Sequence, residues 1–229
     1  MSQDEPYGGV DNLEVMQEAK KYNRFLLDTI CRYSPRGGRI LDFGAGSGQF
    51  AIPMSLQGAN ITALEPDCRL RERIIASGVH TVARPQDLPP HSIDCIYTIN
   101  VLEHIADDVK VLQELRSKLT SNGTLLVYVP AFPVLYTSMD RRVGHVRRYT
   151  RSSLVSAVTR AGFTVDSVAY VDSLGFLAAL LFKVFDDKSG SINLTVLKLY
   201  DRLVFPVSRA LDFFASRWFG KNLLLIART

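Results

Sequence analysis

The sequence lacks several features that would place it in particular classes of protein. No stretch of about eighteen residues is apolar and free of charge, so we expect no membrane-spanning helix. The N-terminus, MSQDEPYGG, has neither the basic nor the apolar segment of a secretory signal. The three cysteines, Cys31, Cys68 and Cys95, are far apart and form no Cys-x-x-Cys pair, so we expect reduced thiols and no metal site. These absences favour a cytoplasmic protein.

The chain does contain enough apolar residues for a full core. Hydrophobic residues make up 47% of its 229 residues, so we expect a single domain over residues 1–229. The net charge is +4, and the basic excess is uneven, because arginines crowd positions 141–151 and basic residues recur over 202–228. Such clusters attract phosphorylated substrates, acidic lipids or nucleic acid, and a solvated basic face is the common alternative.

The most specific pattern is the segment RILDFGAGSGQF, which begins at Arg39. An apolar pair indicates the end of a buried strand, and Asp42 follows it. Gly44, Gly46 and Gly48 then permit a sharp turn and a close approach between the backbone and a ligand. Together with a helix start, this turn predicts a nucleotide-sized cradle whose backbone amides point outward.

The glycine spacing separates this turn from two other nucleotide-binding patterns. A dinucleotide fingerprint has Gly-x-Gly-x-x-Gly, whereas here the third glycine comes one position early and an acid stands at the strand end. The lysine and the Ser/Thr of a P-loop are absent, which disfavours nucleoside triphosphates. Glu65 ends the next apolar run, about twenty residues further on, where an acid can accept hydrogen bonds from ribose hydroxyls.

The turn and Glu65 together resemble the first motif and the ribose-binding acid of the class I S-adenosylmethionine-dependent methyltransferases. The resemblance implies S-adenosylmethionine as cofactor and S-adenosylhomocysteine as product. It also implies that the cofactor is held at the ends of the first two strands, by Asp42, Phe43, Gly44, Ala45, Gly46, Gly48, Glu65 and Pro66.

The rest of the chain predicts strands that alternate with helices. Helices are expected over residues 11–33, 50–57, 68–76 and 107–119, and after a cap at Thr150 or Ser152. Further strands are expected over 60–64, 79–83, 93–99, 124–129 (after an Asn122-Gly123 turn), 163–170 and 222–228. This alternation indicates an α/β fold with a Rossmann-like, seven-stranded, mostly parallel sheet and helices on both faces. The resemblance makes the last strand antiparallel.

We divide this domain into functional segments by their position relative to the predicted sheet. They are an N-terminal cap helix (1–35), a cofactor-binding core (36–130), an acceptor loop (131–152) and a helical insertion between strands six and seven (173–220).

The resemblance places further residues at the cofactor. In methyltransferases of this type an N-terminal helix lies over the cleft, which makes Tyr22 a candidate for the methionine end, with aromatic packing as an equal alternative. Asn100 and Val101, after the fourth strand, are placed beside the sulfonium. The family's adenine-binding acid falls at Arg84 here, so Gln86, Asp87 or the loop backbone are the candidates for the adenine contact.

Residues 131–152 are polar, basic and aromatic and have little apolar periodicity, so they predict a long, functional loop before a helix. The stretch resembles a bacterial methyltransferase subgroup with a P-x-x-P…D-x-x-x-G-H-x-R-R-Y pattern, often linked with envelope glycan or lipid biosynthesis. The resemblance implies a small-molecule or lipid-linked glycan acceptor. The Asn-Pro-Pro-Tyr motif of nucleic-acid amino methyltransferases is absent, so we expect no nucleic-acid substrate.

If the acceptor is a hydroxyl, a base near neutral pKa helps to remove its proton. His145 is the only histidine where an acceptor is expected, so it is the candidate base. The alternatives are an orienting donor, a phosphate contact or a loop hydrogen bond. Asp140 can pair with His145 or with the arginines, and Tyr136 can line the acceptor pocket.

Three neighbouring residues are candidates for binding the acceptor. Arg147 and Arg148 can clamp a phosphate or carboxylate bidentately, or tie the loop down through ion pairs. Tyr149 can line the pocket.

The insertion is far longer than a hairpin needs. It predicts a helix over 174–185, a turn at 186–190 and a second helix over 194–214 that Pro206 kinks or splits. Basic residues beside large apolar ones suit a helix at a membrane interface, and a dimer interface or an acceptor lid suits them as well. Peripheral contact with the inner face of a membrane and a homodimer therefore both stay open.

We conclude that the sequence predicts methyl transfer from S-adenosylmethionine, with a hydroxyl as the favoured acceptor. The alternatives are an N-methyltransferase for a small-molecule amine and a non-catalytic cofactor-binding module. A nicotinamide oxidoreductase is disfavoured by the glycine spacing and by the lack of a Tyr-x-x-x-Lys signature.

Overall fold

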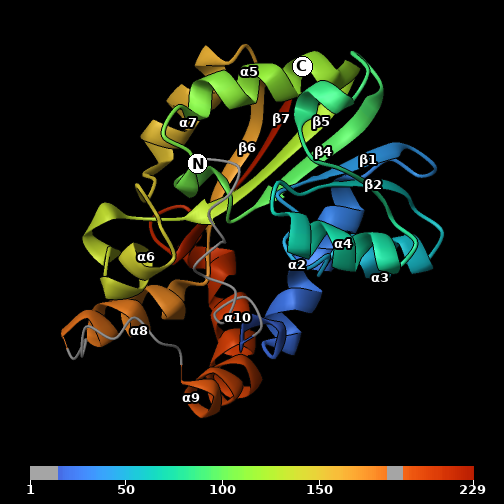
Figure 1. Ribbon diagram of the computed structural model, residues 1–229. Helices are drawn as coiled ribbons and strands as arrows, with labels where there is room; N and C mark the ends of the chain where they lie inside the picture. Colours follow the sequence, from blue (N-terminus) through green and yellow to red (C-terminus); the bar gives the residue numbers. More distant parts are fainter. Residues whose placement is uncertain (1–14, 185–192) are drawn as a thin grey trace.

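The computed structural model describes residues 15–184 and 193–229. At its centre lies a seven-stranded sheet in the order β3-β2-β1-β4-β5-β7-β6 (Figure 1). The strands are β1 (Arg39–Phe43), β2 (Asn60–Leu64), β3 (His80–Val82), β4 (Ile93–Ile99), β5 (Leu119–Pro130), β6 (Thr164–Val171) and β7 (Asn222–Arg228). The α-helices named below are α2 (Lys20–Tyr33), α3 (Ala51–Leu56), α4 (Cys68–Ala76), α5 (Asp108–Lys118), α6 (Ser138–Arg142), α7 (Arg151–Arg160), α8 (Ser173–Val184), α9 (Leu194–Leu199) and α10 (Phe205–Ala215).

The direction of the strands matches the expected fold class. β1 pairs in parallel with β2 and β4, β2 with β3, and β4 with β5. β7 lies between β5 and β6 and runs antiparallel to both. The prediction of a mostly parallel sheet with an antiparallel last strand is therefore confirmed.

Two apolar cores cover the two faces of the sheet. Ile40 and Leu41 are neighbours in β1, and because successive strand residues point to opposite faces they belong to different cores. The Leu41 core lies under α5 and α7, where Leu112 is fully buried. The Ile40 core lies under α2, α3 and α4, where Ile74 is fully buried. Figure 1 shows these two helical layers on either side of the strands.

Some boundaries differ from the sequence predictions. Residues 11–14 of the expected first helix lie outside the described residues, and a helical turn at 15–17 ends before α2 begins at Lys20. β5 begins at Leu119, so the expected turn residues Asn122 and Gly123 lie inside the strand. Asn122 has a positive φ of 67°, and the register of β5 against β4 shifts there.

The second helix of the insertion is split near Pro206, as predicted. A π-helical turn, η4 (Tyr200–Val204), separates α9 from α10. Because Pro206 has no N–H, the carbonyl oxygen of Arg202 loses its usual helical donor. The Lys21 ammonium of α2 donates to that oxygen instead, at 2.9 Å. The turn expected at 186–190 lies outside the described residues.

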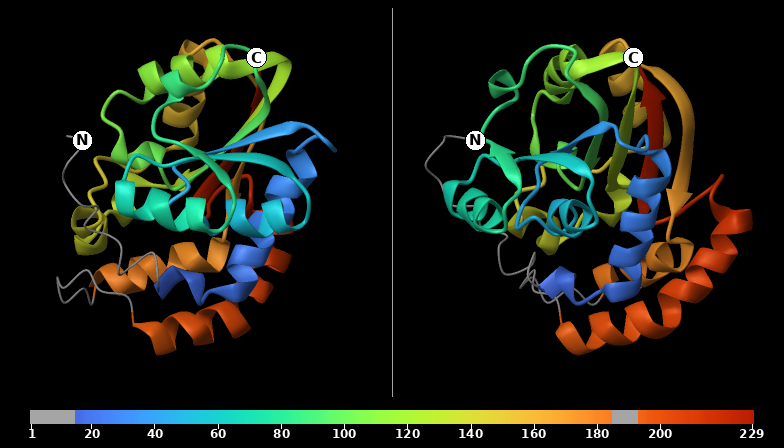
Figure 2. Two further views of the ribbon diagram at one scale, coloured as in Figure 1. Left: turned by 45° about the vertical axis from the view of Figure 1, so that its right-hand side comes forward. Right: turned by 90° about the vertical axis from the view of Figure 1, so that its right-hand side faces the viewer.

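The insertion turns polar side chains toward the rest of the protein. Both carboxylate oxygens of Asp201 accept hydrogen bonds from the first turn of α2, from the amides of Lys21 (2.9 Å) and Tyr22 (2.8 Å). α2 has no N-cap side chain of its own, so Asp201 serves as its cap. Asp212 accepts in the same way from the amides of residues 172 and 173 at the start of α8. Figure 2 shows α8, α9 and α10, in orange to red, gathered beside α2.

The opposite face of the insertion is apolar and exposed. Large apolar side chains recur there every three or four residues and are 43–70% exposed: Val196, Leu199, Leu203, Val207, Leu211, Phe214 and Trp218. Lys198 and Arg202 are exposed beside them. α9 and α10 are therefore amphipathic with the polar face inward. No described helix is long and apolar enough to cross a membrane.

We expect Asp201→Ala to lower the free energy of unfolding by about 1–3 kcal/mol, because two amides of α2 lose a buried acceptor. Urea unfolding followed by circular dichroism measures the change. Asp28→Ala is the control. Asp28 lies within α2, but its side chain makes only an exposed ion pair with Arg24. Equal losses in the two variants would contradict the capping role.

Candidate active site

The strand order reverses between β1 and β4, because the chain winds outward from β1 to β3 and then returns to β4 and β5. In open α/β sheets, ligands bind beyond the carboxyl ends of the strands at such a switch point. The end of β1 leads into the glycine turn at Gly44, the end of β2 into Glu65, and the end of β4 into Asn100 and Val101. The fold therefore brings these predicted cofactor-binding segments to one edge.

The glycines of the turn are required by geometry. Gly44, Gly46 and Gly48 have positive φ angles of 79°, 56° and 81°. A Cβ atom on Gly44 would lie 2.5 Å from a methyl group of Val101, which is too close for any side chain. The turn after β1 and the segment after β4 thus touch directly.

The amides of the turn do not all point outward, which corrects the sequence prediction. The amides of Gly44 and Ala45 donate to the carbonyl oxygen of Leu64. The amide of Gly46 donates to Glu65 Oε2 at 2.7 Å, and the amide of Asp67 donates to the other carboxylate oxygen of Glu65 at 2.9 Å. Glu65 is thereby fixed at the edge, and its remaining lone pairs are available to a ligand.

Asp42 lies beneath the turn and not on its surface. It is 2% exposed, and its Oδ2 has no hydrogen-bond partner among the described residues. Burial raises the pKa of Asp42 to about 7, against the influence of the nearby Tyr97 hydroxyl and Ala51 amide. Asp42 is therefore placed to support the turn and the start of α3.

Tyr22 lies at the same edge, between the cleft and the insertion. Its ring packs edge-on against Tyr128 and Phe205, with centroids 6.2 and 5.4 Å apart. Burial raises the pKa of its hydroxyl, which lies near the Asn100 side chain. The packing that we offered as an alternative is therefore present, and contact with the cofactor stays a prediction.

The candidates for the adenine contact bond to neighbours within the protein. Asp87 Oδ2 accepts from the Arg84 amide at 3.0 Å, and Gln86 Nε2 donates to Glu114. Both residues belong to a short helix, η1 (Pro85–Asp87), next to the end of β3. Their contact with adenine stays a prediction.

A cavity of about 490 Å³ lies between α2 and the glycine turn, and Asn23, Ser47 and Gly48 are among the residues that line it. A cavity of about 530 Å³ lies at the opposite edge of the sheet, where residues such as Gly38 and Asp94 stand at the amino ends of β1 and β4. Only the first is on the side of the switch point, so we associate only that cavity with the site.

The acceptor loop contains short helices that the sequence did not predict. It contains a short helix, η3 (Pro133–Leu135), as well as α6, and Ala131 forms a parallel β-bridge with Tyr149. The ring of Phe132 stacks on Tyr170 of β6 with centroids 4.8 Å apart. The loop is thus folded back onto the end of the sheet.

Asp140 is the centre of this segment. It is fully buried, and His145 Nδ1 lies 2.7 Å from its Oδ1. Arg148 donates to both of its oxygens at 2.9 Å, and the Thr137 amide donates at 2.8 Å. These donors hold the pKa of Asp140 well below its usual range despite its burial. Asp140 therefore pairs with both partners that the sequence offered, the histidine and an arginine.

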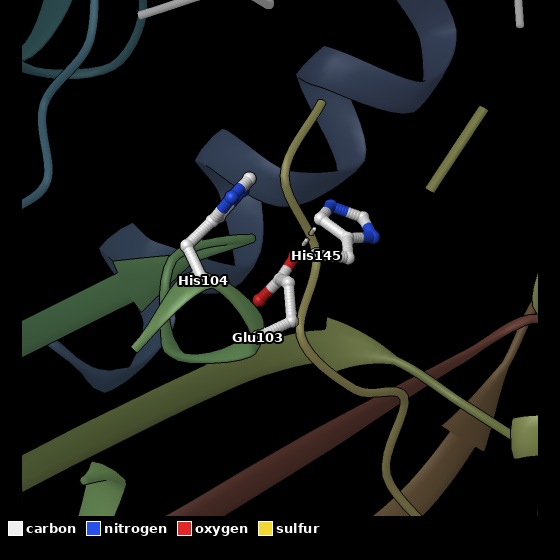
Figure 3. A group of neighbouring side chains, drawn as sticks. All are labelled: Glu103, His104 and His145. Atoms are coloured by element: carbon white, nitrogen blue, oxygen red, sulfur yellow. Dashed lines mark ion pairs between the residues drawn. The ribbon is translucent and has the colours of Figure 1, made fainter. Parts of the chain in front are cut away.

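The other ring nitrogen of His145 faces two more titratable groups, Glu103 and His104 (Figure 3). His145 Nε2 lies 3.7 Å from Glu103 Oε1, and the His104 and His145 rings have centroids 4.6 Å apart. Burial raises the pKa of Glu103 to about 8 and lowers that of His104 to about 4. The sequence analysis missed Glu103 as a site residue, although its place between Asn100 and His104 was the available signal.

The remaining predicted acceptor residues bind within the protein. Tyr136 donates to the His145 carbonyl at 2.7 Å. Arg147 Nη1 donates to Asp108 at 2.9 Å, and the Tyr149 hydroxyl donates to the same carboxylate at 2.7 Å. These contacts match the loop-tying alternative, and contact of these residues with an acceptor stays a prediction.

Most of the described sheet and its helices fall within a known protein family. A family model described as a methyltransferase domain matches residues 17–168, from before α2 into β6. The chain belongs to this methyltransferase family. The resemblance inferred from the glycine turn and Glu65 is thereby confirmed at the level of the family.

The curated relatives match shorter parts of the methyltransferase. One is a 23S rRNA (uracil(1939)-C(5))-methyltransferase of Halomonas elongata, 31% identical over 143 residues, which covers 58% of this chain and 29% of that protein. Another is a ubiquinone biosynthesis O-methyltransferase of Xanthomonas axonopodis pv. citri, 31% identical over 106 residues, which covers 42% and 44%. The chain thus spans less than half the length of these relatives.

Solved structures match over more of the chain. An S-adenosylmethionine-dependent methyltransferase of Mesorhizobium loti superimposes with a TM-score of 0.59 at 18% identity, covering 88% of this chain and 96% of that one. A possible histamine N-methyltransferase of Thermotoga maritima gives 0.63 at 16% identity, with coverage of 95% and 94%. At such identities the likeness shows the fold alone.

We expect Asp42→Asn to change the pH dependence of stability in the ligand-free methyltransferase. Since the folded-state pKa of about 7 exceeds an unfolded value near ~4, wild-type stability falls as the pH rises through this interval. The uncharged variant escapes that loss, so its stability relative to wild type rises by a few kcal/mol, on the order of 1.4 per pKa unit. Urea unfolding at pH 5 and pH 8 measures the difference.

Asp94→Asn is the control, because the Arg39 guanidinium holds the pKa of Asp94 below its usual range. Its stabilisation is complete above an unfolded pKa of ~4, so the difference between that variant and wild type stays constant from pH 5 to 8. A constant difference for Asp42→Asn as well would contradict a buried, protonated acid.

Proposed function

We propose that this chain transfers a methyl group from S-adenosylmethionine to a hydroxyl of a small-molecule or lipid-linked acceptor. The main support is the match to the methyltransferase family, which includes the glycine turn, Glu65 and Val101 at the switch point. The relative named as an O-methyltransferase favours oxygen as the acceptor atom.

The residues present fit this cofactor. Glu65, fixed by two backbone amides, keeps lone pairs that can accept from ribose hydroxyls. Gly44 of the turn lies against Val101 of the segment after β4, and Tyr22 of α2 packs at the same edge. When bound, S-adenosylmethionine supplies an electrophilic methyl group on a sulfonium. The protein contributes by holding the acceptor oxygen in line with it, because positioning supplies much of such a rate enhancement.

We propose that His145 Nε2 accepts the proton of the acceptor hydroxyl. Asp140 is ionised and accepts from His145 Nδ1, so Nδ1 carries a proton and Nε2 keeps a lone pair. Arg148 is a positioning residue in this scheme, since both of its bonds hold Asp140 in place.

A nucleic-acid acceptor is the other possibility raised by the relatives, one of which is named as an rRNA methyltransferase. Two arginines of the acceptor loop argue against it for this chain. Arg147 is bonded to Asp108 and Arg148 to Asp140, so these charges are neutralised within the protein and do not add to a basic surface.

The insertion favours an acceptor that is presented at a membrane surface. Its apolar stripe carries exposed basic residues, and α8 contacts the acceptor loop through the Lys183 ammonium, which donates to the Val134 carbonyl at 2.6 Å. Apolar side chains next to basic ones bind the interface of an anionic membrane. We therefore propose that α9 and α10 dock on anionic lipid, which brings the acceptor loop close to a lipid-linked substrate.

We expect Gly46→Arg to abolish binding of S-adenosylhomocysteine, because φ is +56° there and the amide of this residue holds Glu65. Isothermal titration calorimetry measures the affinity, with NAD as the negative ligand. Gly58→Arg is the matched control: its φ is +85°, and the surrounding space is open, far from the turn. Retained binding in Gly46→Arg would overturn the placement of the cofactor at the glycine turn, and no binding by the wild type would overturn the proposed cofactor.

We expect the double substitution of Leu211→Glu and Phe214→Glu to reduce sedimentation with liposomes of phosphatidylglycerol and phosphatidylcholine at least five-fold. The reason is that two exposed apolar side chains, which we propose to contact the bilayer, become charged. Leu56→Glu with Ile75→Glu is the control, since these residues are 80% and 52% exposed on other helices. Absent liposome binding, with a dimer that the first variant dissociates in analytical ultracentrifugation, would replace the membrane by a second copy of the chain.

A further inference from the structure

Glu103 is a buried acid whose side chain makes no hydrogen bond among the described residues. It is 0% exposed, and neither of its carboxylate oxygens has a hydrogen-bond partner among the described residues. Burying such a group without a hydrogen-bond partner is unfavourable, so buried acids normally have one. Arg148, whose charge acts on Glu103, directs its bonds to Asp140 and to the Ala131 carbonyl.

The second ring nitrogen of His145 faces this carboxyl group. Its Nδ1 proton is committed to Asp140, so Nε2 is the basic nitrogen, and it lies 3.7 Å from Glu103 Oε1. This distance is too long for a hydrogen bond. Histidines that bind a metal through one ring nitrogen usually donate the N–H of the other nitrogen to a carboxylate, as His145 does to Asp140.

His104 completes the cluster. One nitrogen of His104, one of His145 and one oxygen of Glu103 all lie within 4.8 Å of one another. Two ligands that bind one tetrahedral ion at ~2.1 Å lie roughly 3.4 Å apart, so small side-chain movements bring the three atoms to coordination distance. Figure 3 shows the three side chains converging from η2 (Leu102–His104) and from the segment after α6.

We infer that Glu103, His104 and His145 form a binding site for a divalent transition-metal ion. Two imidazoles and one carboxylate suit ions such as Zn²⁺, Mn²⁺, Fe²⁺ or Co²⁺, and they leave coordination positions open. No metal site was predicted from the sequence, because the three cysteines form no Cys-x-x-Cys pair. The histidine ligands come from segments about forty residues apart, and the folded acceptor loop is what brings them together.

The site has an evident use next to the switch point. Glu103 and His104 follow Asn100 and Val101 by only a few residues, so the three ligands adjoin the segment beside which the acceptor is expected. A bound cation holds an acceptor oxygen and lowers the pKa of its hydroxyl, whose proton then passes to solvent water. This use rests on the proposed methyl transfer, and it makes His145 a ligand in place of a free base. Binding of the ion does not depend on that function.

Cobalt titration tests the inference on the full chain, expressed without a histidine tag and stripped with EDTA. We expect one equivalent of Co²⁺ per chain, seen as d–d absorption and by calorimetry. Glu103→Gln keeps the size of the side chain but loses the anionic ligand, and we expect its affinity to fall at least ten-fold. His145→Ala is the second variant, with the same expected loss. His80→Ala, at an exposed histidine in β3, is the control with unchanged binding.

The outcomes separate the metal site from the proposed function. No stoichiometric Co²⁺ binding by the wild type, or full binding in both ligand variants, overturns the inference. Calorimetry with S-adenosylhomocysteine on the same samples reports folding and cofactor binding independently. Retained S-adenosylhomocysteine binding with no metal leaves the proposed function standing alone, and the reverse result leaves the metal site alone.

Discussion

The contact between Gly44 and Val101 is the constraint on which the site depends. It joins the turn after β1 to the segment after β4 at the point where the strand order reverses. Any side chain at position 44 would meet Val101 and push the two segments apart. The segment held in this way continues into Glu103 and His104, so the glycine turn and the histidine cluster share one rigid edge.

The pKa values of the buried acids at this edge depend on how many hydrogen-bond donors surround each of them. Asp42 and Glu103 have few donors around them, so desolvation dominates and their pKa values rise. Asp140 is just as buried, but His145, Arg148 and a backbone amide donate to it, and its pKa falls. Asp140 is thus a charged group with several hydrogen-bond donors, whereas Asp42 has a carboxylate oxygen without a partner among the described residues.

The insertion also separates its polar and apolar side chains by the direction in which they face. Its carboxylates Asp201 and Asp212 face inward and cap α2 and α8, whereas its large apolar side chains face outward. Polar contacts therefore fix the insertion to the methyltransferase core, and the apolar stripe remains for an external surface. α8 also contacts the acceptor loop, so one element of the insertion is joined directly to that loop.

The sequence by itself determined the family and the sheet, and it placed the glycine turn and Glu65 at the ends of neighbouring strands. The glycine spacing, Glu65 and the alternation of strands and helices are local patterns, and local backbone geometry follows from them. β2, β4 and α4 have the expected bounds, and β7 is antiparallel as expected. Even the break at Pro206 was readable, because a missing N–H is a property of one residue.

Only the tertiary structure decided what the acceptor loop does. Asp140, His145 and Arg148 are close in sequence, but their pairing depends on a loop that folds back onto β6. Glu103 and His145 lie some forty residues apart, and the meeting of their side chains depends on packing between two loops. The inward carboxylates of the insertion likewise have partners about forty to 180 residues away in the chain. Sequence periodicity reports which face of an element is apolar, and it carries no information on which distant groups will meet there.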